Sequence, residues 1–229
     1  MRVTLCVGGS VLAPAGPDTD FTKRLAEIIR RLKQDGHELS IVVGGGGPAR
    51  LYIEAGQRLM IPSLKLDELG IAITRLNAKF LILALGDLCE QKPLEAVEGA
   101  SFVLASGKIP VMGGTTPGQT TDAVAAMLAS SLGSDLLIFI SNVDGIYDKD
   151  PKKYQDARKI REMKTSELVE LFGRMRVSPG MNVVIDPVAA KLIHLHKLKC
   201  IVIGRDEIDN LPAILSGKEH SGTTILPGE

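Results

Sequence analysis

The sequence predicts a three-layer α/β/α sandwich with a mainly parallel central sheet, and three observations support this class. Short apolar runs rich in β-branched residues recur without alternating with polar residues, which is typical of strands covered on both faces. Segments with helical spacing of apolar residues separate these runs. Clusters of glycine directly follow three of the runs, as expected where parallel strands turn into helices.

The predicted strands and helices alternate along the chain. Strands are expected at 3–7, 39–43, 109–112, 136–140 and 200–203. Helices are expected at 20–34, 48–59, 70–86, 93–106, 122–132, 165–172, 186–197 and 209–216. The first helix carries an apolar stripe from Phe21 to Leu32. Asp20 stands where its N-cap belongs, and Gly36 lies just past its end.

Composition limits the classes of function. With 27 basic and 27 acidic side chains, the chain has no basic field that would favour nucleic acid or a membrane surface. Its three cysteines form no CxxC pair, which indicates reduced thiols without a disulfide framework or a zinc site. No signal segment opens the chain and no apolar run approaches the ~20 residues that span a bilayer. We therefore expect a soluble, cytoplasmic protein with one domain over residues 1–229.

The three glycine clusters are VGGS at 7–10, GGGGPAR at 44–50 and GGTTPGQTTD at 113–122. A linker would have no apolar run before it and no helix after it. In parallel sheets ligands bind at the carboxyl ends of strands, where glycine lets phosphate oxygens approach the backbone amides. Any single cluster would serve equally well as a tight turn, but three at equivalent positions indicate a site for several phosphates. The GxxxxGK[ST] and GxGxxG patterns are absent.

Two long stretches, 142–164 and 173–185, lack a clear periodicity and are expected to be loops. The segment 140–153, at the start of the first stretch, contains three aspartates and three lysines around Tyr147, a composition that suits a nucleotide site. The aspartates also fit simple turns, so this interpretation stays open here. Residues 173–181 are a candidate for a loop that moves.

At this point the motifs together resemble the amino acid kinase family, and within it the archaeal type of uridylate kinase. The resemblance covers residues 2–226 and rests on VGGS, VVGGGGPAR, GGTTPGQTTDAVAA, SNVDGIYDKDPKK and VIDPVAAK. It implies an amino acid kinase-like sandwich that transfers the γ-phosphoryl of ATP, accompanied by Mg²⁺, to UMP to give UDP and ADP. It also implies a role in pyrimidine nucleotide biosynthesis and assembly into a homohexamer.

Carried over position by position, the resemblance implies two groups of binding residues. ATP would be bound by Gly9, Ser10, Gly46, Arg50, Ser141, Tyr147 and Asp150. UMP would be bound by Gly45, Asp67, Thr115, Thr116, Pro117, Gly118, Gln119, Thr120 and Thr121. No metal ligand from the protein is assigned.

Phosphoryl transfer requires two aligned phosphates and neutralisation of the developing charge. We hypothesise that the amides of residues 8–10 and 45–46 face the reacting phosphates from opposite sides. Gly9, Ser10 and Arg50 are the expected catalytic residues, with Arg50 and Mg²⁺ supplying positive charge. Cys6 and Asn142 stand where other members of the family carry lysines, a departure that the archaeal type shares.

Several side chains also have purely structural interpretations. Cys6 fits a packed core thiol, and Asp186 before a proline fits a helix N-cap. Asp122 fits either an N-cap or a direct role at the acceptor phosphate. Arg75 and Lys79, four residues apart, fit a solvated or subunit-facing stripe on one helix.

Two alternative functions stay open at the level of sequence. A related kinase could use another acceptor, although isopentenyl phosphate kinases have a histidine in the second glycine loop, where this chain has Pro48-Ala49-Arg50. A non-catalytic protein that binds nucleotides or oxyanions on the same fold would explain the missing lysines.

Overall fold

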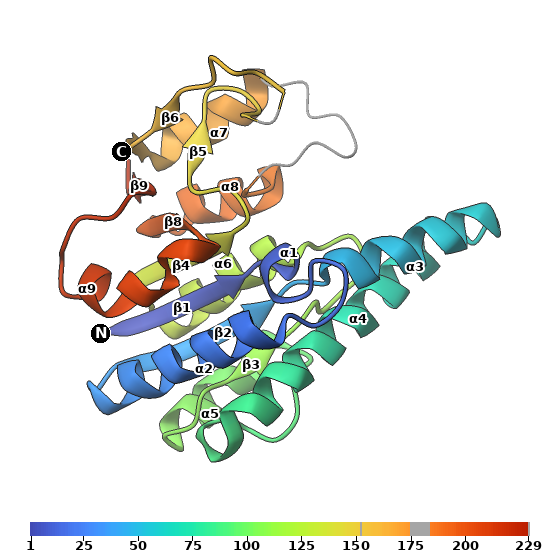
Figure 1. Cartoon of the computed structure of the whole chain (residues 1–229), viewed down its shortest axis with the longest axis horizontal. Helices are drawn as coiled ribbons and strands as arrows, with labels where there is room; N and C mark the ends of the chain where they lie inside the picture. The colour runs from blue at the N-terminus through green and yellow to red at the C-terminus, as the bar shows by residue number, and fades with distance from the viewer. Residues whose placement is uncertain (152, 175–183, 229) are drawn as a thin grey trace.

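The computed structural model describes residues 1–151, 153–174 and 184–228. A seven-stranded sheet in the order β3-β2-β1-β4-β8-β9-β7 forms the centre, and a two-stranded sheet of β5 and β6 stands beside it (Figure 1). The strands are β1 (Arg2–Val7), β2 (Glu38–Val43), β3 (Val111–Met112), β4 (Leu136–Ser141), β5 (Ile146–Tyr147), β6 (Lys159–Ile160), β7 (Glu162–Lys164), β8 (Cys200–Gly204) and β9 (Thr223–Leu226). Adjacent strands of the large sheet are parallel except β8 and β9, which confirms the mainly parallel prediction.

Helices cover both faces of this sheet. They are α1 (Gly9–Leu12), α2 (Thr19–Gln34), α3 (Gly46–Arg58), α4 (Ser63–Leu85), α5 (Ala100–Ala105), α6 (Thr121–Leu132), α7 (Thr165–Arg174), α8 (Pro187–Leu195) and α9 (Leu211–Leu215), with 3₁₀ turns η1 (Gly86–Leu88), η2 (Val97–Gly99) and η3 (Arg205–Asn210). Residues of α2, α4 and α9 form one core with β1, β2 and β4. Residues of α5, α6, α7 and α8 form a second core on the opposite face. The three-layer sandwich is therefore confirmed.

Side chains of β1 point alternately to the two faces of the sheet and so contribute to both cores. Val3, Leu5 and Val7 belong to the first core, whereas Cys6 belongs to the second. All of them are buried because helices cover both faces, so the strand reads as one continuous apolar run. Thr4 is the polar exception, and its hydroxyl is 2.8 Å from that of Ser40 on the neighbouring strand.

Several element predictions were wrong in detail. Helix α4 begins at Ser63, well before the predicted start at residue 70. The early start was not predicted because the first turns are largely exposed and carry no apolar stripe. Residues 93–96 are not helical, since the Leu94 amide bonds to the Val111 carbonyl beside β3. Asp18, not Asp20, is the N-cap of α2, where its carboxylate accepts from the Phe21 amide at 2.9 Å. Gly36 follows α2 with a φ of +83°, as predicted.

The predicted loop at 142–164 contains the short strands β5, β6 and β7. Strand β9 was also missed, because such short segments carry too few residues for a periodic pattern. The loop predicted to move, 173–181, lies outside the described residues from position 175 onward.

Helix α4 is also relevant to the expectation about membranes. By length and composition alone, Ser63–Leu88 would be long enough to cross a membrane, and 33% of its apolar window is buried in this structure. Leu81, Ile82 and Leu85 pack in the first core. The charged side chains of Arg75 and Lys79 interrupt its apolar sequence and bind carbonyl groups of neighbouring loops.

Candidate active site

The carboxyl ends of β2, β1 and β4 lie side by side because these strands are adjacent and parallel. The Gly8 amide donates to the Ile140 carbonyl at 2.9 Å, and the Gly44 amide donates to the Val7 carbonyl at 2.9 Å. These bonds continue the sheet pairing into the loops. The first two glycine clusters and the loop after β4 therefore meet at one edge of the sheet, as the sequence predicted.

The two glycine loops touch backbone to backbone. A Cβ atom added to Gly9 would lie 2.0 Å from the Gly46 nitrogen, and one added to Gly44 would lie 2.4 Å from the Gly9 nitrogen. Gly46 also has a φ of +68°, a conformation that residues with a Cβ rarely adopt. Glycine is required here by the close approach of the two loops, which excludes the linker interpretation.

The backbone amides where the two glycine loops meet differ in whether they donate a hydrogen bond within the protein. Those of Gly9, Ser10, Gly45 and Gly46 have no acceptor within the described part of the chain. The Gly8 amide is engaged with Ile140, so the hypothesis that it faces the phosphates was wrong. Four amides are left to bind an oxyanion, two from each loop.

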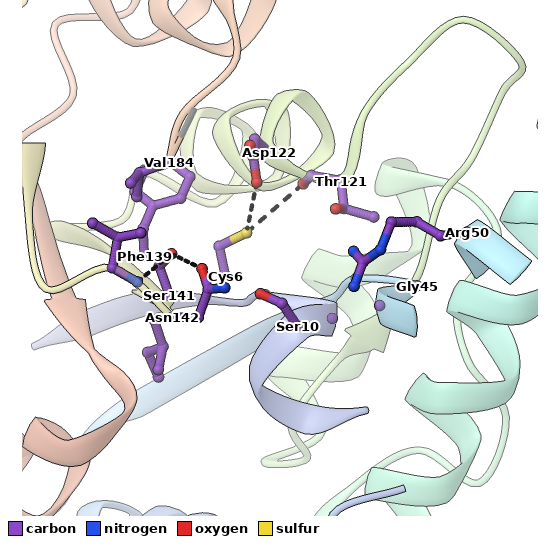
Figure 2. Close-up of a pocket in the computed structure, with 16 residues that line it drawn as sticks. Cys6, Ser10, Gly45, Arg50, Thr121, Asp122, Phe139, Ser141, Asn142 and Val184 are labelled. Atoms are coloured by element: carbon purple, nitrogen blue, oxygen red, sulfur yellow. Dashed lines mark hydrogen bonds between the residues drawn. The ribbon is translucent and has the colours of Figure 1, made fainter. Parts of the chain in front are cut away.

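Two adjoining cavities open at this edge. The first, of about 480 Å³, is lined by the loops after β1, β2 and β4 and by the start of α6 (Figure 2). The second, of about 570 Å³, lies between α3, α4 and the loop 113–121. Both are lined by Gly45, Gly46, Arg50 and Thr121. These shared residues mark where a ligand in one cavity would meet a ligand in the other.

Most of the predicted site residues line one of these cavities. Gly9, Ser10 and Ser141 line the first cavity. The second is lined by Asp67, Pro117, Gly118, Gln119 and Thr120. Thr115 and Thr116 line a third cavity, on the side of α6, together with Gln119. Tyr147 and Asp150 line none of these three.

Tyr147 is held by its own neighbours. Its hydroxyl donates to the Asp144 carboxylate at 2.8 Å, and the Lys159 ammonium lies 5.8 Å from the ring centroid and also binds Asp144. Burial and then this hydrogen bond raise the pKa of the Tyr147 phenol. The assignments of Tyr147 and Asp150 to ATP stay predictions.

Arg50 is the only cationic side chain among the described residues that line the first cavity. Its guanidinium extends from α3 toward Gly45 in Figure 2. Because Arg50 lines both cavities, its charge is placed where two phosphates would approach each other.

Asp122 is a functional candidate that the sequence left undecided. Thr120 is the N-cap of α6, with its hydroxyl accepting from the Ala123 amide, so the capping role proposed for Asp122 was wrong. The Asp122 carboxylate lines the first cavity and accepts from the Cys6 thiol at 3.5 Å (Figure 2). Burial, and then the neighbouring Asp186 carboxylate, raise the pKa of Asp122 to about 7.

The other structural interpretations had mixed outcomes. Cys6 is a buried thiol, and burial raises its pKa further above the usual range. Asp186 caps α8, where its carboxylate accepts from the Val188 amide at 2.7 Å and also from the Thr120 hydroxyl. Arg75 does not form a simple solvated stripe, because its guanidinium donates to the Gly114 carbonyl at 3.1 Å.

The described residues contain no group of three or more His, Cys, Asp or Glu side chains that could hold a metal ion.

Comparisons with known proteins agree with this architecture. The model of the amino acid kinase family matches residues 1–204. The chain is 48% identical over 204 residues to the uridylate kinase of Methanocaldococcus jannaschii, which covers 89% of this chain and 90% of the relative. It is 43% identical over 227 residues to the uridylate kinase of Thermococcus kodakarensis, covering 99% and 100%.

Solved structures lead to the same family. The uridylate kinase of Archaeoglobus fulgidus matches with a TM-score of 0.86 and 37% identity, over 98% of this chain and 100% of that chain. An aspartate kinase from Synechocystis shares the fold with a TM-score of 0.75 at 19% identity, over 100% of this chain and 40% of the longer one. With the family pattern matched over most of its length and the fold shared with these enzymes, the chain belongs to the amino acid kinase family.

Proposed function

We propose that this chain is a uridylate kinase that transfers the γ-phosphoryl group of ATP to UMP and forms UDP and ADP. The observation that carries the proposal is the pair of adjoining cavities that share Gly45, Gly46, Arg50 and Thr121. A kinase needs two substrates whose phosphates meet, and this arrangement provides two spaces with one common boundary. The names of the archaeal relatives support UMP as the acceptor.

In this proposal ATP occupies the first cavity, with Ser141 toward its nucleoside end. The amides of Gly9, Ser10, Gly45 and Gly46 donate to the phosphoryl oxygens, and Arg50 lies at the boundary with the acceptor. Charge that develops on the transferring group is stabilised by donors already in position, the largest electrostatic contribution available to such a site.

UMP occupies the second cavity. Asp67 faces its ribose, and the loop 115–121 surrounds the uridine and its phosphate. The loop has a defined conformation in the structure, because the Gly118 amide donates to the Asp67 carboxylate at 2.8 Å. A ribose hydroxyl would compete for the same carboxylate, which makes the position of Gly118 sensitive to occupancy of the site.

We further propose that Mg²⁺ enters with ATP. Mg²⁺ is commonly held by substrate phosphates and one or two carboxylates, not by a cage of protein ligands. The donor set fits this mode, since Asp122 is a carboxylate that lines the first cavity and the described residues offer no larger metal cluster. When bound, the ion would supply positive charge to the phosphates, which is valuable in a chain that lacks lysine at Cys6 and Asn142.

The cellular setting is also part of the proposal. We expect a cytoplasmic enzyme of pyrimidine nucleotide biosynthesis that acts as a homohexamer, without nucleic-acid or membrane partners. Apolar side chains exposed on α3 and α4 support assembly, among them Tyr52, Leu76 and Leu83.

Incubation with ATP, Mg²⁺ and a panel of acceptors tests the function. The acceptors are UMP, CMP, AMP and isopentenyl phosphate, and the product is separated by ion-exchange chromatography. UDP as the main product supports the proposal. A different favoured acceptor would assign the chain to another kinase of the family, and no product from any acceptor would favour a non-catalytic binding protein.

A further inference from the structure

Helix α4 places polar side chains in the interior between the two loops that carry the substrates. Thr74 is 8% exposed and Asn77 is 6% exposed, although both are polar. Buried polar groups must be hydrogen-bonded to avoid a large cost, so their partners indicate what they hold in place. Both side chains bind glycine residues of the candidate active site.

Asn77 binds the loop between β2 and α3. Its side-chain nitrogen donates to the Gly44 carbonyl at 2.9 Å and to the Gly45 carbonyl at 3.0 Å. Each carbonyl belongs to the same planar peptide unit as the next amide, and in a trans peptide the C=O and N–H groups point in opposite directions. Asn77 therefore fixes the two peptide planes whose amides are those of Gly45 and Gly46.

Those two amides are among the four that have no acceptor within the described chain, and both residues line both cavities. Glycine backbone has more conformational freedom than that of other residues, because it lacks the steric limits set by a Cβ. One buried side chain thus helps to set the direction of two donors at the boundary between the two cavities, without lining the first cavity itself.

Thr74 binds the other loop, one helical turn before Asn77. Its hydroxyl accepts from the Gly114 amide at 2.7 Å and donates to the Ile71 carbonyl at 2.6 Å. The fit is close, since a Cβ added to Gly113 would lie 2.5 Å from this hydroxyl oxygen. The methyl group of Thr74 faces the loop after β2, where it would lie 3.4 Å from a Cβ added to Gly45.

We propose that Asn77 and Thr74 are positioning residues for phosphoryl transfer, through which α4 holds the donor-facing amides and the acceptor loop at a fixed separation. The inference rests on the proposed function. It differs from a purely structural role because it concerns the direction of the Gly45 and Gly46 amides at the reacting phosphates. Displacement of reacting groups by about 1 Å is sufficient to lower turnover by about 100-fold.

The central experiment measures steady-state kinetics of Asn77→Ala with ATP and UMP, normalised to folded protein. We expect kcat to fall by about 10- to 100-fold, while each KM changes by less than about threefold, because the donors matter most in the transition state. The matched control is Lys79→Ala on the same helix, whose ammonium donates to the Gln91 carbonyl at 2.6 Å, away from both cavities. Its kcat should stay within about twofold of wild type.

A second pair of variants keeps the test decisive if Asn77→Ala does not fold. Thr74→Val preserves the shape but removes the hydroxyl, and kcat should fall by about tenfold, whereas Thr74→Ser keeps the hydroxyl and should restore it. Folded Asn77→Ala or Thr74→Val with wild-type kcat overturns the inference. If the wild-type chain is inactive with every acceptor, both the proposed function and this inference are overturned. If the wild type is active and the variants keep its kcat, only the inference is overturned.

Discussion

The charge of Arg50 is balanced by few other charged side chains around the first cavity. Cys6 and Asn142 line the first cavity without charge, and Asp122 adds an acidic group to it. The cavity therefore presents one cationic side chain among the residues described, and that side chain also lines the second cavity. Arg50 and a nucleotide-bound cation would have to offset the phosphate charge between them.

Replacement of Arg50 by alanine should reduce kcat/KM by about 100- to 1,000-fold, because loss of one well-placed donor to such a transition state costs ~3–4 kcal/mol. The measurement is steady-state kinetics with ATP varied at saturating UMP. Arg58→Ala, at the last position of the same helix and exposed, is the control and should behave like wild type. Unchanged turnover together with unchanged ATP affinity would remove Arg50 from the mechanism.

Asp122 should make the stability of the chain depend on pH. Its pKa of about 7 in the folded state exceeds the ordinary 3.8, so between these values the folded chain holds a proton that the unfolded chain has lost. Folded stability therefore falls as pH rises from about 4 to about 7 and then levels off. Asp122→Asn should remove this loss and be more stable than wild type at pH 8, by on the order of 2–4 kcal/mol.

Urea unfolding at pH 4, 6 and 8 measures this difference. The exposed Asp20→Asn provides the control for the loss of a carboxylate at the surface. An Asp122→Asn chain whose stability relative to wild type does not change over this range would contradict a raised pKa.

At the scale of elements, α2 shows how a cap and a tertiary contact act together. The Asp18 carboxylate accepts from the Phe21 amide and binds the Arg205 guanidinium at 2.9 Å. The first of these bonds and then the second lower the pKa of Asp18. The sequence alone suggested Asp20, because both aspartates precede the same apolar stripe and only the backbone conformation separates them.

Asp18→Ala should destabilise the chain by about 1 kcal/mol at neutral pH through loss of the N-cap. For a chain of this size that corresponds to a fall in Tm of about 2–4 °C. Because the pKa of Asp18 is lowered in the folded state, its contribution is present above about pH 4 and is lost as the pH falls below it. Differential scanning calorimetry would compare the Tm of Asp18→Ala with that of Asp20→Ala. A larger fall in Tm for Asp20→Ala would show that Asp20, not Asp18, is the N-cap.

At the scale of the whole molecule, the two faces of α4 differ in what they contact. The inner face binds the loops that follow β2 and β3 and packs Leu81 and Leu85 into the core. On the outer face, Leu76 and Leu83 are each 64% exposed and lie seven residues apart, so they share one side of the helix. Exposed apolar side chains on a long helix are consistent with the proposed assembly of several copies.

Leu76→Glu should lower the assembly state if this outer face lies between copies, because a charge would be buried without a partner. Size-exclusion chromatography with multi-angle light scattering measures the mass. Gln34→Glu, at the exposed end of α2, introduces the same change in charge elsewhere and should leave the mass unchanged. Equal masses for wild type and Leu76→Glu would exclude this face as an essential interface.

Much of the fold was predictable from local patterns. Buried strands such as β1 and β4 appear as short apolar runs because both faces of the sheet are covered, and Gly36 and Asp186 follow the local chemistry of helix ends. The short strands β5, β6, β7 and β9 were missed because a few residues cannot establish a period. Resemblance to a family supplied the candidate site residues, and their individual roles stay predictions.

The sequence by itself determined the order of β1, β2, β3, β4 and β8 and of the longer helices between them, together with the glycine clusters at the strand ends, since these follow from local periodicity and backbone freedom. Only the tertiary structure decided that Asn77 and Thr74 bind the glycine loops after β2 and β3, because each is an ordinary polar residue until these strands lie beside α4. The tertiary structure also decided that Asp122 lines a cavity and accepts a hydrogen bond from Cys6. Both facts depend on residues that are distant from Asp122 in the sequence. Contacts between distant segments depend on the strand order of the sheet, which no local pattern encodes.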